Sequence, residues 1–265
     1  MTVVACQQLA PSLGDLRHNA ELSSNAIAEA AAAGADVIVL PELITSGYVF
    51  ESRAEARAAS IPPAHELFDT WRRAAGDGRV VIGGFAETGP DDTVFNSLVV
   101  LHGNVPAVVY RKAHLWDREK LWFTPGDAMP PVVGTAQGRI AAMICYDMEF
   151  PEMTRSVAMR GAQLLAVPTN WPFFPRPTGE RAPEVVIAMA AARVNRMAIA
   201  CCDRDGVERG VEWTRGSTIV SAEGWPVAEF SERKLVLADV DLSFADSKVI
   251  SERNDLLGDR RIDLY

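Results

Sequence analysis

The chain has 265 residues, of which 48% are hydrophobic and 23% are charged, proportions that are ordinary for a globular protein. Its 26 basic and 35 acidic side chains give a net charge of −9 without any run of Lys or Arg, which argues against binding to nucleic acid or to an anionic membrane surface. No apolar stretch reaches the roughly 18 residues of a membrane-spanning helix and the N-terminus does not resemble a signal peptide, so we expect a cytoplasmic protein.

Short apolar segments alternate with amphipathic segments along the first half of the chain. The apolar segments have the length of buried strands, and the amphipathic ones place Ala and Leu side chains along one helical face. The first helix should end at Gly34, because glycine favours helix ends. We predict strands over residues 2–8, 36–40, 79–86, 95–101 and 105–111, and helices over 17–33, 51–58 and 65–75.

The same alternation continues through the second half. A Pro-rich segment, 168–183, separates a strand from a helix and is interpreted as a loop at the active site. Hairpins mixed with strand–helix units favour an α/β sandwich with sheets inside and helices outside. No Gly/Ser/Pro linker divides the chain, so we expect one domain over 1–265. We predict strands over 138–145, 164–168, 197–203, 217–221, 227–230 and 234–240, and helices over 152–160, 183–195 and 243–253.

The four cysteines are Cys6, Cys145, Cys201 and Cys202. They form no C-x-x-C pair and no Cys/His group with the spacing of a zinc site. Free thiols, most of them buried, are therefore expected, and we expect neither a metal nor another cofactor. One of the four cysteines could instead be a nucleophile.

Three segments carry ionisable side chains just beyond an apolar strand, where α/β folds build ligand sites. Glu42 follows a buried strand and lies between Leu40 and Leu43, so burial would raise its pKa towards that of a general base. Lys112 and Glu119 follow another strand, and Cys145 lies where a strand turns into a helix, a typical position for a nucleophile. Taken alone, each segment has another interpretation. Glu42 would also fit an exposed turn, the segment with Lys112 and Glu119 a charged surface loop, and Cys145 a buried strand cysteine.

Taken together and in order, these segments resemble the nitrilase, or carbon–nitrogen hydrolase, superfamily over essentially the whole chain. The resemblance rests on Pro41-Glu42-Leu43, on Arg111-Lys112-Ala113-His114-Leu115 and on the run from Cys145 to Glu152, CYDMEFPE. Supporting matches are Ser46-Gly47-Tyr48, Asn96-Ser97, Pro168-Thr169-Asn170-Trp171 and Gly216-Ser217. It implies a four-layer αββα sandwich that pairs as αββα–αββα.

The resemblance also implies a set of catalytic residues. Cys145 would attack the carbonyl carbon, and Glu42 would take the thiol proton and later pass it to the leaving ammonia. Lys112 and the backbone N–H of Tyr146 would stabilise the oxyanion, while Glu119 would orient Lys112. We expect Tyr48, Tyr146, Asn170 and Trp171 to contact the substrate, and His114 to have a structural role.

The residues after Cys145 favour an amidase that converts small aliphatic carboxamides to carboxylic acid and ammonia through a thioester. Within the resemblance, Tyr146-Asp147 is amidase-like, whereas nitrilases usually have Trp-Glu there. An omega-amidase or an N-carbamoyl amide hydrolase is the alternative, although Glu149 replaces a cation that such enzymes often carry at this place. A nitrilase, and a protein of this fold without activity, are less favoured.

The C-terminal segment is predicted to contact a second subunit. The family places a partner's C-terminal tail near the interface, and residues 243–265 would have that position here. The expected partners are therefore a small amide substrate and another copy of the chain, in a homodimer or a larger homo-oligomer.

Overall fold

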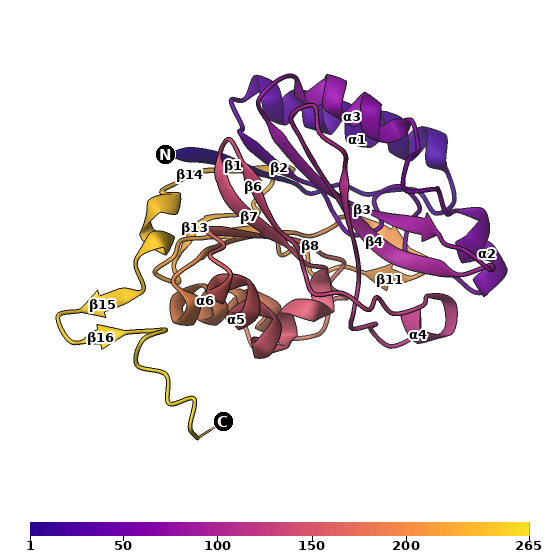
Figure 1. Cartoon of the computed structure of the whole chain (residues 1–265). Helices are drawn as coiled ribbons and strands as arrows, with labels where there is room; N and C mark the ends of the chain where they lie inside the picture. The colour runs from indigo at the N-terminus through magenta and orange to yellow at the C-terminus, as the bar shows by residue number, and fades with distance from the viewer. Residues whose placement is uncertain (265) are drawn as a thin grey trace.

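A computed structural model describes residues 1–264 and contains two six-stranded sheets packed face to face between two layers of helices (Figure 1). The strand order is β14-β1-β2-β3-β4-β5 in the first sheet and β13-β12-β9-β8-β7-β6 in the second. Helices α1 and α3 cover the outer face of the first sheet, and α5 and α6 cover that of the second. The predicted αββα sandwich is thereby confirmed.

The first sheet alternates its side chains between the two layers that it contacts. Val37 and Val39 of β2 pack towards the second sheet, whereas Ile38 and Leu40 pack with α1 and α3, because successive strand residues point to opposite faces. The elements of this half are β1 (Thr2–Gln7), α1 (Leu16–Ala32), β2 (Val37–Val39), α2 (Arg53–Ala58), α3 (Leu67–Ala75), β3 (Val80–Thr88), β4 (Val94–His102), β5 (Val108–Arg111), α4 (Glu119–Trp122) and β14 (Leu235–Val240).

The second sheet has a central parallel part, β7-β8-β9, with antiparallel strands at both ends. Cys201 and Cys202 lie in β9 and are fully buried, as predicted. All four cysteines are free. The elements of this half, in which β10 and β11 pair as a separate two-stranded sheet, are β6 (Val132–Thr135), β7 (Gly138–Ala142), α5 (Pro151–Met159), β8 (Leu164–Pro168), α6 (Pro183–Asn195), β9 (Ala198–Cys202), β10 (Val207–Glu208), β11 (Val211–Glu212), β12 (Thr218–Val220) and β13 (Pro226–Glu229).

The helix predicted over 243–253 is wrong. The chain instead forms a single 3-10 turn, Leu242–Asp246, in which the Asp241 side chain caps the backbone N–H of Ser243. A hairpin of β15 (Val249–Ser251) and β16 (Asn254–Asp255) follows, because β-branched Val249 and Ile250 favour extended backbone. Figure 1 shows this hairpin and the following tail projecting from the sandwich.

No helix within residues 1–264 is both long and apolar enough to cross a lipid bilayer.

Candidate active site

The predicted acid and base residues are brought together at one end of the first sheet. Glu42 follows β2, Lys112 follows β5, and Glu119 opens α4. The backbone at Glu42 lies so close to β3 that a Cβ at Gly84 would be 2.6 Å from the Glu42 Cα, so only glycine fits there. Glu42, Lys112 and Glu119 are each at most 3% exposed.

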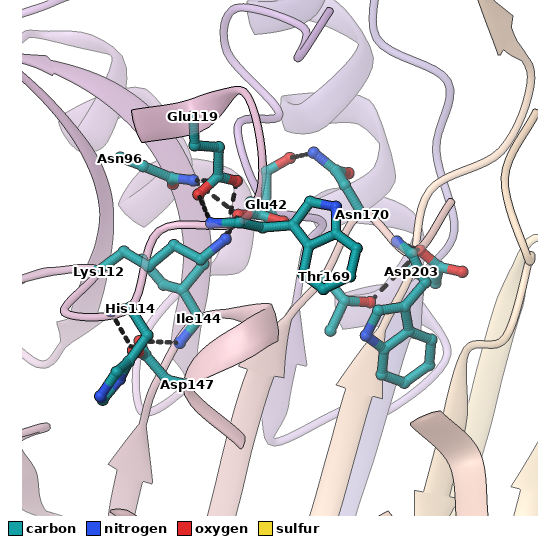
Figure 2. A network of polar contacts seen from close by, with 12 residues as sticks. Glu42, Asn96, Lys112, His114, Glu119, Ile144, Asp147, Thr169, Asn170 and Asp203 are labelled. Carbon is teal, nitrogen blue, oxygen red and sulfur yellow. Dashed lines mark hydrogen bonds and ion pairs between the residues drawn. The ribbon is translucent and has the colours of Figure 1, made fainter. Parts of the chain in front are cut away.

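Lys112 lies between the two carboxylates (Figure 2). Its Nζ donates to Glu42 Oε1 at 2.7 Å and to Glu119 Oε1 at 2.8 Å. The Asn96 side chain, from β4, donates to Glu42 Oε1 at 2.6 Å and to Glu119 Oε1 at 3.3 Å. The backbone N–H of Trp116 donates to Glu119 Oε2 at 2.9 Å. Both glutamates are therefore held in fixed orientations by these donors.

Glu42 keeps one oxygen available for chemistry. Its Oε2 is buried and has no hydrogen-bond partner among residues 1–264. Burial raises the pKa of Glu42 to about 7; the Lys112 cation opposes the rise and the Glu119 charge adds to it. Burial lowers the pKa of Lys112, but the charges of Glu119 and Glu42 outweigh burial and keep that pKa well above its usual value. A base that titrates near neutrality thus lies beside a permanent cation.

Cys145 comes from the second sheet. The strand ends at Ala142, three residues earlier than predicted, and Cys145 opens a 3-10 helix, Cys145–Glu149, with a positive φ of 45°. Non-glycine residues seldom adopt that conformation, and it is typical of a strained turn that presents a nucleophile. Burial and the Glu42 charge raise the pKa of the Cys145 thiol well above its usual value, so the resting thiol is protonated and needs a base.

A buried aspartate holds the turn that carries Cys145. Asp147 accepts hydrogen bonds from the His114 backbone N–H at 2.9 Å and the Ile144 backbone N–H at 3.2 Å (Figure 2). It also accepts one from the Tyr110 hydroxyl at 2.9 Å. His114 Nδ1 lies 2.9 Å from Asp147 Oδ1, and its ring stacks on Phe150. His114 thus contacts a structural carboxylate, in agreement with its expected structural role.

The loop after β8 joins the two halves of the site. The Asn170 side chain donates a hydrogen bond to the Glu42 carbonyl oxygen at 3.0 Å. The backbone N–H of Asn170 donates a hydrogen bond to the Cys145 sulfur. Asp203, just after β9, accepts from the backbone N–H groups of Trp171 at 3.0 Å and Gly216 at 2.9 Å. These bonds fix the loop without requiring regular secondary structure.

A cavity of about 260 Å³ borders Glu119. Tyr48 and Trp213 meet edge to face in its wall, with ring centroids 5.5 Å apart. Among the predicted substrate contacts, only Tyr48 lines this cavity; Trp171 is 2% exposed and packs in the core. Half of its lining residues are aromatic, and three more are charged: Tyr48, Phe50, Trp116, Trp122, Phe174 and Trp213, together with Asp117, Arg118 and Glu119.

Sequence reasoning missed the positions of three residues that hold this site. Asn96 was visible only as a supporting match, and neither Asp147 nor Asp203 was assigned a role. Their common signal is an Asp or Asn within or just after an apolar strand, where burial requires hydrogen-bond partners. Within residues 1–264, no group of three or more His, Cys, Asp or Glu residues is placed to hold a metal ion.

The family model for carbon–nitrogen hydrolases matches residues 3–248. A nitrilase of Pyrococcus abyssi is 34% identical, with 100% of this chain and 99% of the relative covered. An (R)-stereoselective amidase of a Pseudomonas species is 32% identical, covering 96% and 90%, and the deaminated glutathione amidase of Mus musculus is 30% identical, covering 99% and 84%.

The fold is also similar to that of solved amidase structures. The amidase of Nesterenkonia sp. AN1 superposes with a TM-score of 0.81 at 27% identity, covering 100% of this chain and 98% of that one. Variants of that amidase carry acrylamide, or the acetamide moiety of fluoroacetamide, added covalently at the active-site cysteine. Another variant was solved in complex with butyramide.

Proposed function

We propose that this chain, which belongs to the carbon–nitrogen hydrolase family, hydrolyses small aliphatic carboxamides to the carboxylic acid and ammonia. The observation that carries the proposal is the arrangement of Lys112 between Glu42 and Glu119, with Glu42 Oε2 unpartnered among the described residues. That arrangement supplies a base and an oxyanion-stabilising cation beside a protonated thiol, which are the requirements for acyl transfer through cysteine.

In the proposed reaction, Glu42 takes the proton of the Cys145 thiol, and the thiolate attacks the carbonyl carbon of the amide. The negative charge that forms on the carbonyl oxygen is stabilised by Lys112 and by the backbone N–H of Tyr146, which has no intrahelical acceptor at the start of a helix. Glu42 returns the proton to nitrogen, the C–N bond breaks, and ammonia leaves behind a thioester. Water, deprotonated by Glu42, attacks the thioester carbonyl and releases the acid and the thiol.

Glu119 has a different role in this proposal. It contacts Lys112 through one oxygen and the Trp116 backbone through the other, so it holds the ammonium group in place. A lysine with two carboxylate partners stays cationic through the whole cycle, because each partner favours the charged form.

The lining of the cavity beside Glu119 favours a substrate with an uncharged acyl group. Six of its twelve lining residues are aromatic, and burial of an apolar acyl chain against such a wall is favourable by about 25 cal/mol per Å². The relatives that act on amides, and the butyramide bound to the Nesterenkonia amidase, support an amide rather than a nitrile as the preferred substrate.

One observation favours a second candidate, an omega-amidase whose substrate carries a distal carboxylate. Arg118 lines the same cavity, lies over the Trp122 ring at 5.6 Å, and forms no ion pair with any carboxylate in the described part of the chain. Its guanidinium could pair with the distal carboxylate of such a substrate. The relationship to deaminated glutathione amidase supports this alternative.

Ammonia release from propionamide, propionitrile, succinamate and N-carbamoyl-β-alanine separates these activities. We expect the highest kcat/KM with propionamide and no turnover by Cys145→Ala. Activity that survives in Cys145→Ala would contradict the mechanism, and faster turnover of propionitrile would contradict the choice of substrate. A preference for succinamate that disappears in Arg118→Ala would establish the omega-amidase instead.

A further inference from the structure

The loop that carries Tyr48 is held by a carboxylate from a distant part of the chain. Glu208, in β10, accepts hydrogen bonds from the backbone N–H groups of Tyr48 at 2.8 Å and Val49 at 2.5 Å. The fit is tight, since a Cβ at Gly47 would lie 2.7 Å from Glu208 Oε2 and Gly47 has a φ of +77°. Glu208 therefore fixes both the path of this loop and the direction in which Tyr48 leaves it.

Arg204 in turn holds Glu208. Its Nη2 donates to Glu208 Oε2 at 2.9 Å and to the Pro11 carbonyl oxygen at 3.3 Å, and its guanidinium carbon lies 4.4 Å from the centre of the Trp213 ring. Arg204 is 1% exposed and Glu208 is 6% exposed, so the pair is buried. The guanidinium thus links the Tyr48 loop with the aromatic ring that Tyr48 touches.

Stability alone is a poor explanation for this pair. The Nε and Nη1 atoms of Arg204 are buried and have no hydrogen-bond partner among residues 1–264. Unsatisfied charged donors are costly, and replacing a buried ion pair by apolar side chains is often neutral or stabilising. A role in fixing geometry accounts better for a buried pair whose guanidinium is only partly satisfied.

The geometry that the pair fixes is that of the cavity wall. Tyr48 and Trp213 form one side of the cavity, and Glu119 lies in its lining. Burial, together with the charges of Glu119 and Glu42, holds the pKa of Tyr48 well above its usual value. The Tyr48 hydroxyl therefore remains a hydrogen-bond donor beside the acidic side of the site at any pH near neutrality.

We propose that Arg204 and Glu208 are positioning residues for amide binding, which hold the Tyr48 wall of the cavity in the orientation that the substrate requires. They do not touch the substrate themselves and act through Tyr48, whose ring packs edge to face on Trp213. This inference rests on the proposed amidase function for its kinetic test, and a second test below does not require hydrolysis.

The kinetic test combines Glu208→Gln with Tyr48→Phe. Glu208→Gln keeps the shape of the side chain but removes the charge that pairs with Arg204. We expect it to raise KM for propionamide by about 10- to 100-fold with a smaller change in kcat, since a small misplacement of a binding group has effects of that size. In a protein that already carries Tyr48→Phe, adding Glu208→Gln should raise KM by less than about twofold, because the effect of Glu208 passes through Tyr48.

Arg204→Lys provides a second variant if Glu208→Gln does not fold, and Arg181→Gln is the matched control. Arg181 forms an exposed ion pair with Glu229, so its loss should leave KM unchanged. If Glu208→Gln and Arg204→Lys lower only the melting temperature while KM stays at the wild-type value, the positioning role is refuted. Additive effects of Glu208→Gln and Tyr48→Phe would also refute it.

Alkylation of Cys145 by iodoacetamide tests the same idea without turnover. Iodoacetamide is itself a small primary amide, so its saturation constant reports how well the cavity places an amide. We expect the saturation constant to rise in Glu208→Gln and not in Arg181→Gln, as followed by intact mass. If the wild-type chain hydrolyses no amide but this pattern holds, the proposed function fails and the positioning role stands; equal constants in all three proteins would overturn the positioning role.

Discussion

Neutralising Glu119 should separate its effect on Lys112 from its effect on Glu42. Glu119 Oε1 lies 2.8 Å from Lys112 Nζ, and Oε2 accepts from the Trp116 backbone at 2.9 Å. In Glu119→Gln one of these donors faces an NH₂ group, so at least one hydrogen bond is lost. A hydrogen bond to a charged group contributes about 1.5–3 kcal/mol. If that loss falls on the transition state, kcat/KM decreases by about 10- to 160-fold.

The same substitution should move the pH profile in a defined direction. The charge of Glu119 raises the pKa of Glu42, so removing the charge lowers that pKa and shifts the acid limb of kcat/KM to lower pH. Initial rates of ammonia release across neutral and mildly acidic pH measure both effects in one experiment. Glu223→Gln, in an exposed turn, is the control. Wild-type kcat/KM together with an unmoved acid limb would refute the reasoning.

Three further predictions test other parts of the structure. In the wild-type protein, kcat/KM should rise with pH to a plateau with a midpoint near 7, since Glu42 must be ionised to accept the thiol proton; a flat profile between pH values on either side of 7 would contradict this. Asp147→Ala should leave two buried donors and one half-buried donor unsatisfied and cost about 3 kcal/mol, which is a decrease in melting temperature of about 6–12 °C by scanning fluorimetry; an unchanged melting temperature would count against it. We also propose that the tail, residues 243–265, contributes to a homodimer, so its removal beyond residue 247 should halve the mass measured by light scattering; an identical mass for both proteins would exclude that role.

The sandwich could be predicted because its elements are locally encoded. Val37 to Leu40 form an apolar run flanked by loop residues, and α6 begins at Pro183, so both elements were found close to their observed bounds. The end of the strand before Cys145 could not be found in this way. It depends on Asp147, which binds the Ile144 backbone N–H and stops the strand early, and this contact is not visible in a hydrophobic pattern.

The error at residues 243–253 has a similar cause. Side chains such as Glu252 and Arg253 are compatible with a helix, and the segment has too few apolar residues for periodicity to decide. In the site, the motifs around Glu42, Lys112 and Cys145 and their order along the chain indicated that these residues lie in one site. The hydrogen bonds made by Asn96 and Asp203 depend instead on residues that are distant in sequence and close only in the folded chain. The regular elements and the proximity of Glu42 and Lys112 were therefore predictable, and the hydrogen bonds that orient these side chains were not.

The division of the site between two sheets has a consequence for how the enzyme would lose activity. The proposed base Glu42 and the proposed cation Lys112 follow strands of the first sheet, and the proposed nucleophile Cys145 follows a strand of the second, with the Asn170–Glu42 hydrogen bond between them. The distance between Glu42 and Cys145 is therefore set by the apolar layer where the sheets meet. A slight sliding or separation of the sheets would stop catalysis while every strand and helix remained intact. Enzyme activity should thus be the most sensitive measure of inter-sheet packing, and should fall before circular dichroism detects any unfolding.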